Sequence, residues 1–163
     1  MRQLIKNLAL LVALCMTTVA AGYAQEPSKV EVKINEIVKR YENVKGVESV
    51  TVVKGSGLEL VKMLFTRQFG KDFMKGVKSI TMIDYSDATA EVCQALRKEI
   101  DAFSAVMKEF NLGEEKKFAE YNYIKSFASS VEENTMSDFI TALEDNKKKT
   151  KMIMYMAGTI KIE

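Results

Sequence analysis

Several stretches of the chain place apolar residues three and four positions apart, which is the spacing of one helix face. The predicted helices cover residues 30–41, 58–65 and 92–110, with a short one through residue 143 that Thr135 or Ser137 can open. For the helix over 92–110, Ser86 or Asp87 can cap the start by accepting hydrogen bonds from the first free amides. Asn111 and Gly113 are residues at which such a helix commonly ends.

Other stretches are short, rich in β-branched residues and typical of strands. They cover residues 47–53, 79–85, part of 118–131, and 150–162, the last of which is a strand or a hairpin. Gly158 falls inside the last of these stretches and predicts a bulge or a bend there. Helices and strands in this order predict an α+β domain with a single mixed or largely antiparallel sheet of about four strands. We expect the helices to pack mainly on one face of that sheet.

The first 24 residues have the pattern of a secretory signal peptide. Arg2 and Lys6 give a positive start, residues 8–19 are almost continuously apolar, and small residues follow. A retained membrane anchor would need about 20 apolar residues, and this run is shorter. We therefore expect residues 1–24 to be removed and residues 25–163 to form a single globular α+β domain without an integral membrane span. The predicted location is the periplasm or the outer membrane.

The charge of the exported part argues against a nucleic-acid partner. The whole chain has 24 Lys and Arg residues against 22 Asp and Glu residues, and two of the basic ones, Arg2 and Lys6, lie in the leader. The remainder is formally neutral, so it has no overall field that would attract a polyanion. We expect no nucleic acid among the partners.

The lack of histidine narrows the possible chemistry further. Serine–histidine and cysteine–histidine catalysis are impossible, and so is a zinc site built on imidazole. Cys93 is the one cysteine beyond the leader, so no internal disulfide can form in the mature chain. Its place in the apolar pattern of a helix predicts a buried thiol, with a reactive thiol or a link between two copies as the alternative.

Two acidic residues are the candidates for catalysis. Asp84 and Asp87 flank Tyr85 at the end of a predicted strand. Paired carboxylates can divide the acid and base roles of a hydrolase when their surroundings differ. The competing interpretation, which we favour, is that Asp87 caps the next helix and Asp84 ends the strand.

Met152, Met154 and Met156 are the candidates for binding a soft metal. Alternate residues of a strand share one face, and three thioethers on one face suit cuprous ion. Because methionine also fills irregular gaps in a core, core packing is the competing interpretation and the one that we favour.

Three further groups have a possible binding role beside a structural one. They are Gly55-Ser56-Gly57, the lysines Lys147, Lys148, Lys149 and Lys151, and the aromatic residues Tyr121, Tyr123 and Phe127. The first could bind an anion at a helix start, the second lipid phosphates or an acidic glycan, and the third a sugar or a peptide. For the glycine-containing stretch we favour a plain strand-to-helix turn, and for the lysines a solvated turn. Whether the aromatic residues face solvent or the helices stays open.

With the leader and this order of elements, the chain resembles the small exported proteins of unknown function that are common in Bacteroidetes. The stretches that carry the resemblance are residues 34–41, 50–53, 58–65, 79–82 and 154–160. These stretches are structural patterns that would cover most of the mature chain. The resemblance implies the compartment and the α+β fold, and it carries no catalytic residues.

The leading hypothesis is a non-enzymatic cell-envelope protein that binds a protein partner. It requires no catalytic residue, cofactor or metal. One alternative is a small-ligand or cuprous carrier, and a second is a histidine-free hydrolase that uses Asp84 and Asp87. The sequence leaves the oligomeric state open.

Overall fold

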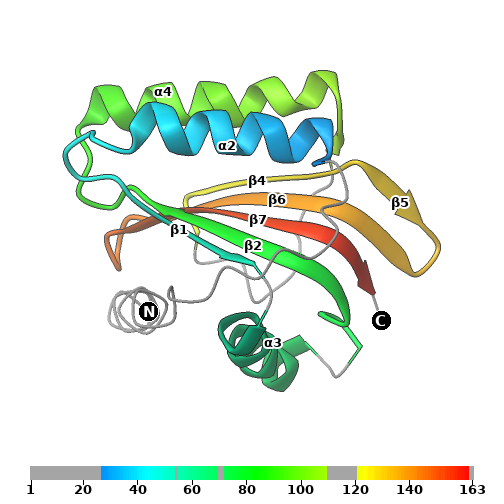
Figure 1. The fold of residues 1–163 in the computed structure, drawn as a ribbon. Coiled ribbons are helices and arrows are strands. Elements are labelled where there is room, and N and C mark those ends of the chain that lie inside the picture. The colour runs from blue at the N-terminus through cyan, green and yellow to red at the C-terminus, as the bar shows by residue number, and fades with distance from the viewer. Residues whose placement is uncertain (1–26, 54, 70–71, 110–120, 162–163) are drawn as a thin grey trace.

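The computed structural model describes residues 27–53, 55–69, 72–109 and 121–161, and residues 64–69 only by their backbone. In chain order (Figure 1) the elements are α2 (Lys29–Tyr41), β1 (Glu48–Val53), α3 (Gly55–Phe69), β2 (Gly76–Asp84), α4 (Ala90–Asp101), the 3₁₀ turn η1 (Ala102–Ala105), β3 (Lys108–Glu109), β4 (Tyr123–Ala128), β5 (Ser130–Glu132), β6 (Thr135–Asp145) and β7 (Thr150–Lys161). The predicted signal peptide lies outside the described residues.

The strands form one antiparallel sheet. Their order is β1-β2-β7-β6-β4-β3, and β5 pairs with β6 beside this path. The α+β class and the largely antiparallel sheet are therefore confirmed. The predicted number of about four strands is too low, because the described part of the chain forms seven.

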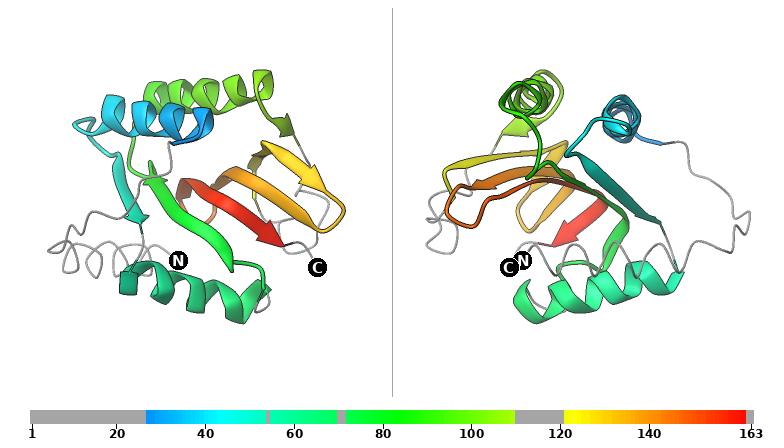
Figure 2. Two further views of the ribbon diagram at one scale, coloured as in Figure 1. Left: turned by 45° about the vertical axis from the view of Figure 1, so that its right-hand side comes forward. Right: turned by 90° about the vertical axis from the view of Figure 1, so that its left-hand side faces the viewer.

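Helices lie on both sides of the sheet. Figures 1 and 2 show α2 and α4 side by side over one face, which we call the two-helix face, and α3 against the opposite face, which we call the α3 face. The prediction of helices mainly on one face is met by α2 and α4, and α3 is the exception. Both faces are covered because the inner strands carry apolar side chains on both sides, as in β7.

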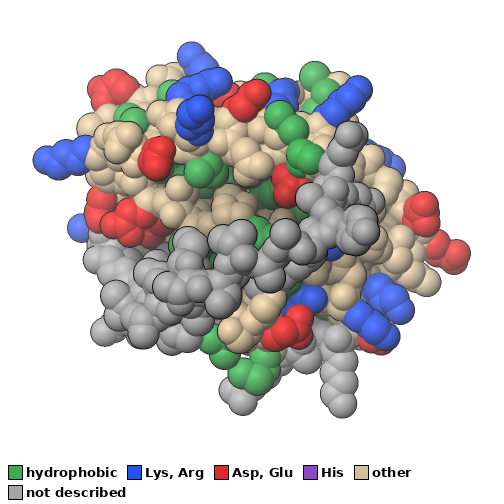
Figure 3. Space-filling model, in the orientation of Figure 1, with side chains coloured by type: hydrophobic (Ala, Val, Ile, Leu, Met, Phe, Trp, Pro, Cys, Tyr) green, Lys and Arg blue, Asp and Glu red, His purple; other side chains and the backbone are tan. Residues whose placement is uncertain are grey.

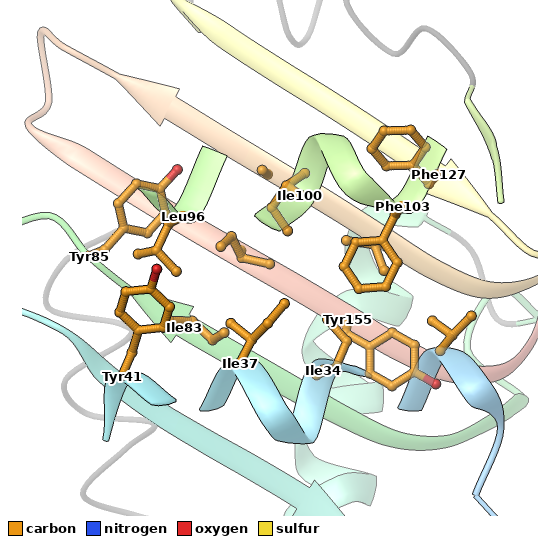
Figure 4. Close-up of a cluster of buried hydrophobic side chains, with 14 of the residues drawn as sticks. Ile34, Ile37, Tyr41, Ile83, Tyr85, Leu96, Ile100, Phe103, Phe127 and Tyr155 are labelled. Carbon is orange, nitrogen blue, oxygen red and sulfur yellow. The ribbon is translucent and has the colours of Figure 1, made fainter. Parts of the chain in front are cut away.

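The larger core lies between the two-helix face and its helices. Ile34 of α2 and Leu96 and Ile100 of α4 are completely buried there, together with Phe103 of η1 and Tyr155 of β7. Figure 4 shows these side chains pointing toward one another from the helices and the sheet. Each fully buried apolar side chain contributes about 1.5–3 kcal/mol, so this layer supplies much of the stability of the fold.

The second core lies on the α3 face and is rich in methionine. Leu58 and Val61 of α3 are buried against it. Its methionines are Met74, Met82, Met136, Met154 and Met156, with Met152 packed at the margin. The unbranched, flexible thioether side chain suits the irregular space between a helix and a twisted sheet.

Residues 135–145 form strand β6 and not the predicted short helix. This strand pairs on both edges and is buried on both faces over most of its length. A strand in that position needs apolar residues on both sides, so its sequence loses the alternation that marks a half-buried strand. The spacing of Phe139, Ile140 and Leu143 then fits a helix equally well, which is why the prediction failed.

Helix α4 is shorter than predicted, and its cap is a different residue. The hydroxyl of Thr89, not a side chain of Ser86 or Asp87, accepts a hydrogen bond from the amide of Val92 at 3.4 Å. After Asp101 the chain forms the tighter 3₁₀ turn η1. The apolar residues of this turn continue the helical spacing of α4, so the sequence alone predicts a longer α-helix. The predicted stop residues Asn111 and Gly113 lie outside the described residues.

The predicted irregularity at Gly158 is confirmed. Its φ is +103°, and the register of β6 against β7 shifts between Ser137 and Phe139. Asp138, the residue between them, has a φ of +47° and accepts hydrogen bonds from the Tyr155 hydroxyl at 3.1 Å and from the Gly158 amide at 3.5 Å. The bulge is thus fixed by a carboxylate as well as by a glycine.

Candidate functional site

The most concentrated polar chemistry in the described residues surrounds Glu144 near the end of β6. Glu144 lies two and four residues beyond Ala142 and Ile140, so all three share the two-helix face. The side chain is 1% exposed, which places a carboxylate on the apolar side of a central strand. A buried charge of this kind requires a matched partner and hydrogen bonds to the oxygens.

Arg97 of α4 and Tyr85 after β2 satisfy this carboxylate. The Nε atom of Arg97 donates to Oε1 at 2.7 Å, and a terminal nitrogen of the same guanidinium donates to Oε2. The Tyr85 hydroxyl donates to Oε1 at 3.0 Å. Burial acts to raise the pKa of Glu144, but the hydrogen bonds from Arg97 and Tyr85 outweigh it and leave the pKa below its ordinary value.

Tyr123 and Lys151 complete what we call the Glu144 cluster. The Arg97 guanidinium lies over the ring of Tyr123, 5.0 Å from its centre, and burial raises the pKa of that phenol. The Lys151 ammonium donates to the sulfur of Cys93 at 3.1 Å and also favours the charged form of Glu144. The cluster joins α4 to strands β4, β6 and β7. Its charged groups therefore help to hold the helix against the sheet.

The two candidate catalytic carboxylates are Asp84, the last residue of β2, and Asp87, which lies in the connection between β2 and α4. The Oδ1 atom of Asp84 accepts a hydrogen bond from the Ser86 amide at 2.8 Å, which closes the turn after β2. Asp87 is exposed, and its backbone carbonyl packs closely against Gly46. The residue between them, Tyr85, is brought instead to Glu144. The structure therefore uses Asp84 and Asp87 in the connection between β2 and α4.

Met154, Met156 and the lysines at 147–149 behave as the favoured interpretations predict, whereas Lys151 lies in β7 and contacts Cys93. Met154 and Met156 are buried in the core of the α3 face, while Met152 lies at its margin. The lysines at 147–149 are exposed in the turn between β6 and β7. Asp145 organises that turn by accepting hydrogen bonds from the amides of Lys147 and Lys148 at 2.9 and 3.0 Å.

The aromatic residues and the glycine-rich stretch are also placed. Phe127 is completely buried on the two-helix face and Tyr123 packs beside it, so these two residues face the helices; Tyr121 is half-buried ahead of β4. Gly55, with a φ of +78°, and the two residues after it form the first turn of α3. Cys93 is buried, as predicted from its place in the helix pattern.

Sequence reasoning missed Arg97, Glu144 and Asp138. Arg97 stands beside the apolar residues of the predicted helix, and nothing local in the sequence pairs it with Glu144. Glu144 precedes the lysine run between the predicted short helix and the last predicted strand, because β6 is not predicted as a strand. On a strand, the alternation of Ile140, Ala142 and Glu144 would have indicated a charged residue on an apolar face, which is the signal that could have found it.

One edge of the sheet is formed by β1. This strand pairs with β2 along its whole length, from Glu48 opposite Asp84 to Val53 opposite Ser79, and its other edge has no partner strand among the described residues. Val53 is 60% exposed. At the other end of the sheet, β3 has only two residues, both of them charged.

Comparisons with known protein families, with curated proteins and with solved structures give no match to this chain. Within the described ranges, no helix is long and apolar enough to cross a membrane. The same residues contain no cluster of three or more acidic or cysteine side chains that could hold a metal ion. On the face seen in Figure 3, acidic and basic side chains are interspersed rather than gathered by sign.

Proposed function

We propose that this protein is an exported, non-enzymatic interaction domain of the cell envelope, and that it binds a protein partner by adding a strand of that partner to β1. The signal-peptide pattern of residues 1–24 supports the location. The observation that carries the binding mode is the open edge of β1. The carboxylates of Glu144 and Asp138 accept hydrogen bonds from Arg97 and Tyr155, so both take part in contacts within the fold.

Among the described residues, strand β1 lacks the shortness, the bulge, the lysine and the proline that protect many sheet edges. Such edges are normally kept short, bulged, or interrupted by lysine or proline, because their free amides and carbonyls can pair with any extended chain. Strand β3 fits that description, with two residues and an ion pair between Glu109 and Lys125 at 2.7 Å. Strand β1 is six residues long, pairs with β2 without a register shift, and contains neither lysine nor proline.

The side chains of β1 indicate what kind of segment would fit. Val50 and Val52 belong to the α3 face, where both contact its apolar core. Thr51 lies on the two-helix face, where its hydroxyl is 3.0 Å from that of Thr81. A partner strand would therefore place apolar residues beside the valines, and small polar residues beside Ser49 and Thr51.

The test compares two exposed valines. Val53→Lys puts a charge on the open edge, whereas Val106→Lys makes the same change after η1, and these valines are 60% and 55% exposed. After chemical crosslinking of cell envelopes, we expect proteins joined to the unsubstituted chain and to Val106→Lys to be lost from Val53→Lys. Equal recovery with the two variants would overturn the proposal, provided that circular dichroism shows both to be folded.

One observation favours the cuprous-carrier hypothesis as a second candidate. Met82 of β2 lies directly opposite Met154 of β7, so a fourth thioether joins Met152, Met154 and Met156 on the α3 face. Thioethers are ligands suited to cuprous ion, and directly opposed side chains have Cβ atoms about 4.5–5.5 Å apart.

Titration with cuprous ion against a chromogenic chelator tests this candidate. If the methionine face binds copper, Met82→Leu and Met154→Leu should each weaken competition at least tenfold, while Met63→Leu on the exposed side of α3 should not. No competition by the unsubstituted protein would remove the candidate.

A further inference from the structure

We infer that the strand added to β1 is β1 of a second copy of this chain, so that the two sheets continue into one another. This inference rests on the proposed function, because it uses the same open edge and names its occupant. Only some antiparallel pairings of β1 with itself keep each face of the first sheet continuous with the same face of the second.

Symmetry restricts these pairings. When two identical strands pair antiparallel about a two-fold axis perpendicular to the sheet, residues opposite each other must come from the same face. Side chains alternate between faces along a strand, so one residue has to lie on the axis opposite itself. Val50 and Thr51 are the two residues near the middle of β1 that can take that place.

The side chains decide between the two registers. With Val50 on the axis, the Glu48 carboxylate lies directly opposite Val52 of the second copy on the apolar α3 face, which is unfavourable. With Thr51 on the axis, Val50 lies opposite Val52 and Ser49 lies opposite Val53. This register pairs valine with valine beside the α3 core and covers Val53, the most exposed large apolar side chain of the described residues.

Hydroxyl groups favour the same register. Thr51 and Thr81 already bring their hydroxyls within 3.0 Å, and a second copy would extend this pair into a row of four threonines across the axis. Glu48 is the one charged residue of β1, and the two copies of it would lie at opposite ends of the pair.

The register can be tested by cysteine crosslinking in protein whose own Cys15 and Cys93 are replaced by serine and alanine. Opposed residues of a strand pair come close enough for a disulfide, with Cβ atoms about 3.5–4.5 Å apart in the bond. We expect Thr51→Cys to form a disulfide with itself under mild oxidation. Ser49→Cys and Val53→Cys should crosslink when mixed, and much less when each is alone.

Sedimentation of the unsubstituted protein provides an independent measurement that needs no cysteine. We expect its mass to rise with concentration from one chain to two, since pairing through a single strand is a small interface. Val53→Lys should stay at the mass of one chain, and Val106→Lys should behave like the unsubstituted protein.

A mass of one chain at every concentration, together with no Thr51→Cys disulfide, would overturn the inference. If Val53→Lys still loses its crosslinked proteins in the envelope test, the proposed function survives and the occupant of the edge is a different protein. A disulfide at Val50→Cys in place of Thr51→Cys would overturn the register.

Discussion

Replacing Arg97 by methionine should remove the main support of the buried Glu144 carboxylate. Methionine keeps most of the volume and the apolar contacts of the arginine stem but none of its donors. Glu144, at 1% exposure, would then keep the Tyr85 hydroxyl and the more distant charge of Lys151. Arg97→Met is therefore a direct test of how much the Glu144 cluster contributes to stability.

The size of the effect follows from the exposure of the two partners. Breaking a buried ion pair from one side costs about 3–5 kcal/mol, because the remaining charge is left uncompensated. The side chain of Arg97 is 43% exposed, so water screens part of the interaction and places the expected loss at the lower end, about 3 kcal/mol. For a domain of this length, this corresponds to a fall in Tm of about 10 °C.

Urea denaturation measures the loss as a lower midpoint at unchanged slope. Arg40→Met is the matched control, because Arg40 pairs with Glu99 at the surface and is 58% exposed; it should cost less than about 1 kcal/mol. The double variant Arg97→Met with Glu144→Leu should recover much of the stability, since it removes the unpaired charge. A single variant no less stable than Arg40→Met, or a double variant as unstable as Arg97→Met, would refute this reasoning.

The same variants have a predicted pH dependence. In the unsubstituted protein the pKa of Glu144 lies below its unfolded value, so its stabilising contribution is present above that value and is lost as the pH falls through the folded pKa. Without Arg97, burial is no longer outweighed and the folded pKa rises. The penalty of Arg97→Met should therefore be largest at pH 7 and shrink toward pH 4, where the carboxyl group can protonate.

Two further changes test the backbone. Gly46→Ala should destabilise by more than about 2 kcal/mol in thermal unfolding, because φ is +84° and the new Cβ would lie 2.3 Å from the Asp87 carbonyl oxygen; Gly55→Ala, at φ +78° with open space around it, should cost about 1 kcal/mol. Equal losses for the two glycines would contradict the close approach. Asp138→Ala should cost about 1–3 kcal/mol because it leaves the buried Tyr155 hydroxyl without its acceptor, and Asp138→Asn should cost less, as measured by urea denaturation.

Helix α2 is predicted correctly, and it has one buried side. Its apolar stripe at Val30, Ile34, Ile37 and Tyr41 is unambiguous, and each of these residues is buried. Strand β7 is also predicted over residues 150–162 with an irregularity at Gly158, although both of its faces are buried. In both cases the local pattern and the tertiary environment require the same residues, so the element can be predicted from the sequence alone.

The error at β6 has a physical cause, which is burial on two sides. Strand β6 lies inside the sheet with helices on both faces, so apolar residues fill positions that an outer strand would leave polar. Arg97 and Glu144 come from segments 47 residues apart in the chain, and only the packing of α4 on the sheet shows that their charges cancel. A single sequence gives the pattern within each segment, but it does not give which segments meet.

Photo-crosslinking from β1 in cells tests the central claim most directly. A photoreactive residue is placed at position 49, 51 or 53, with position 106 as the control, and the joined peptides are identified by mass spectrometry. Strand addition predicts that the three β1 positions join alternate residues of one extended segment in reverse order, and that position 106 does not. Joined peptides with no such order, or equal yields from positions 53 and 106, would contradict the account of β1 as a binding edge.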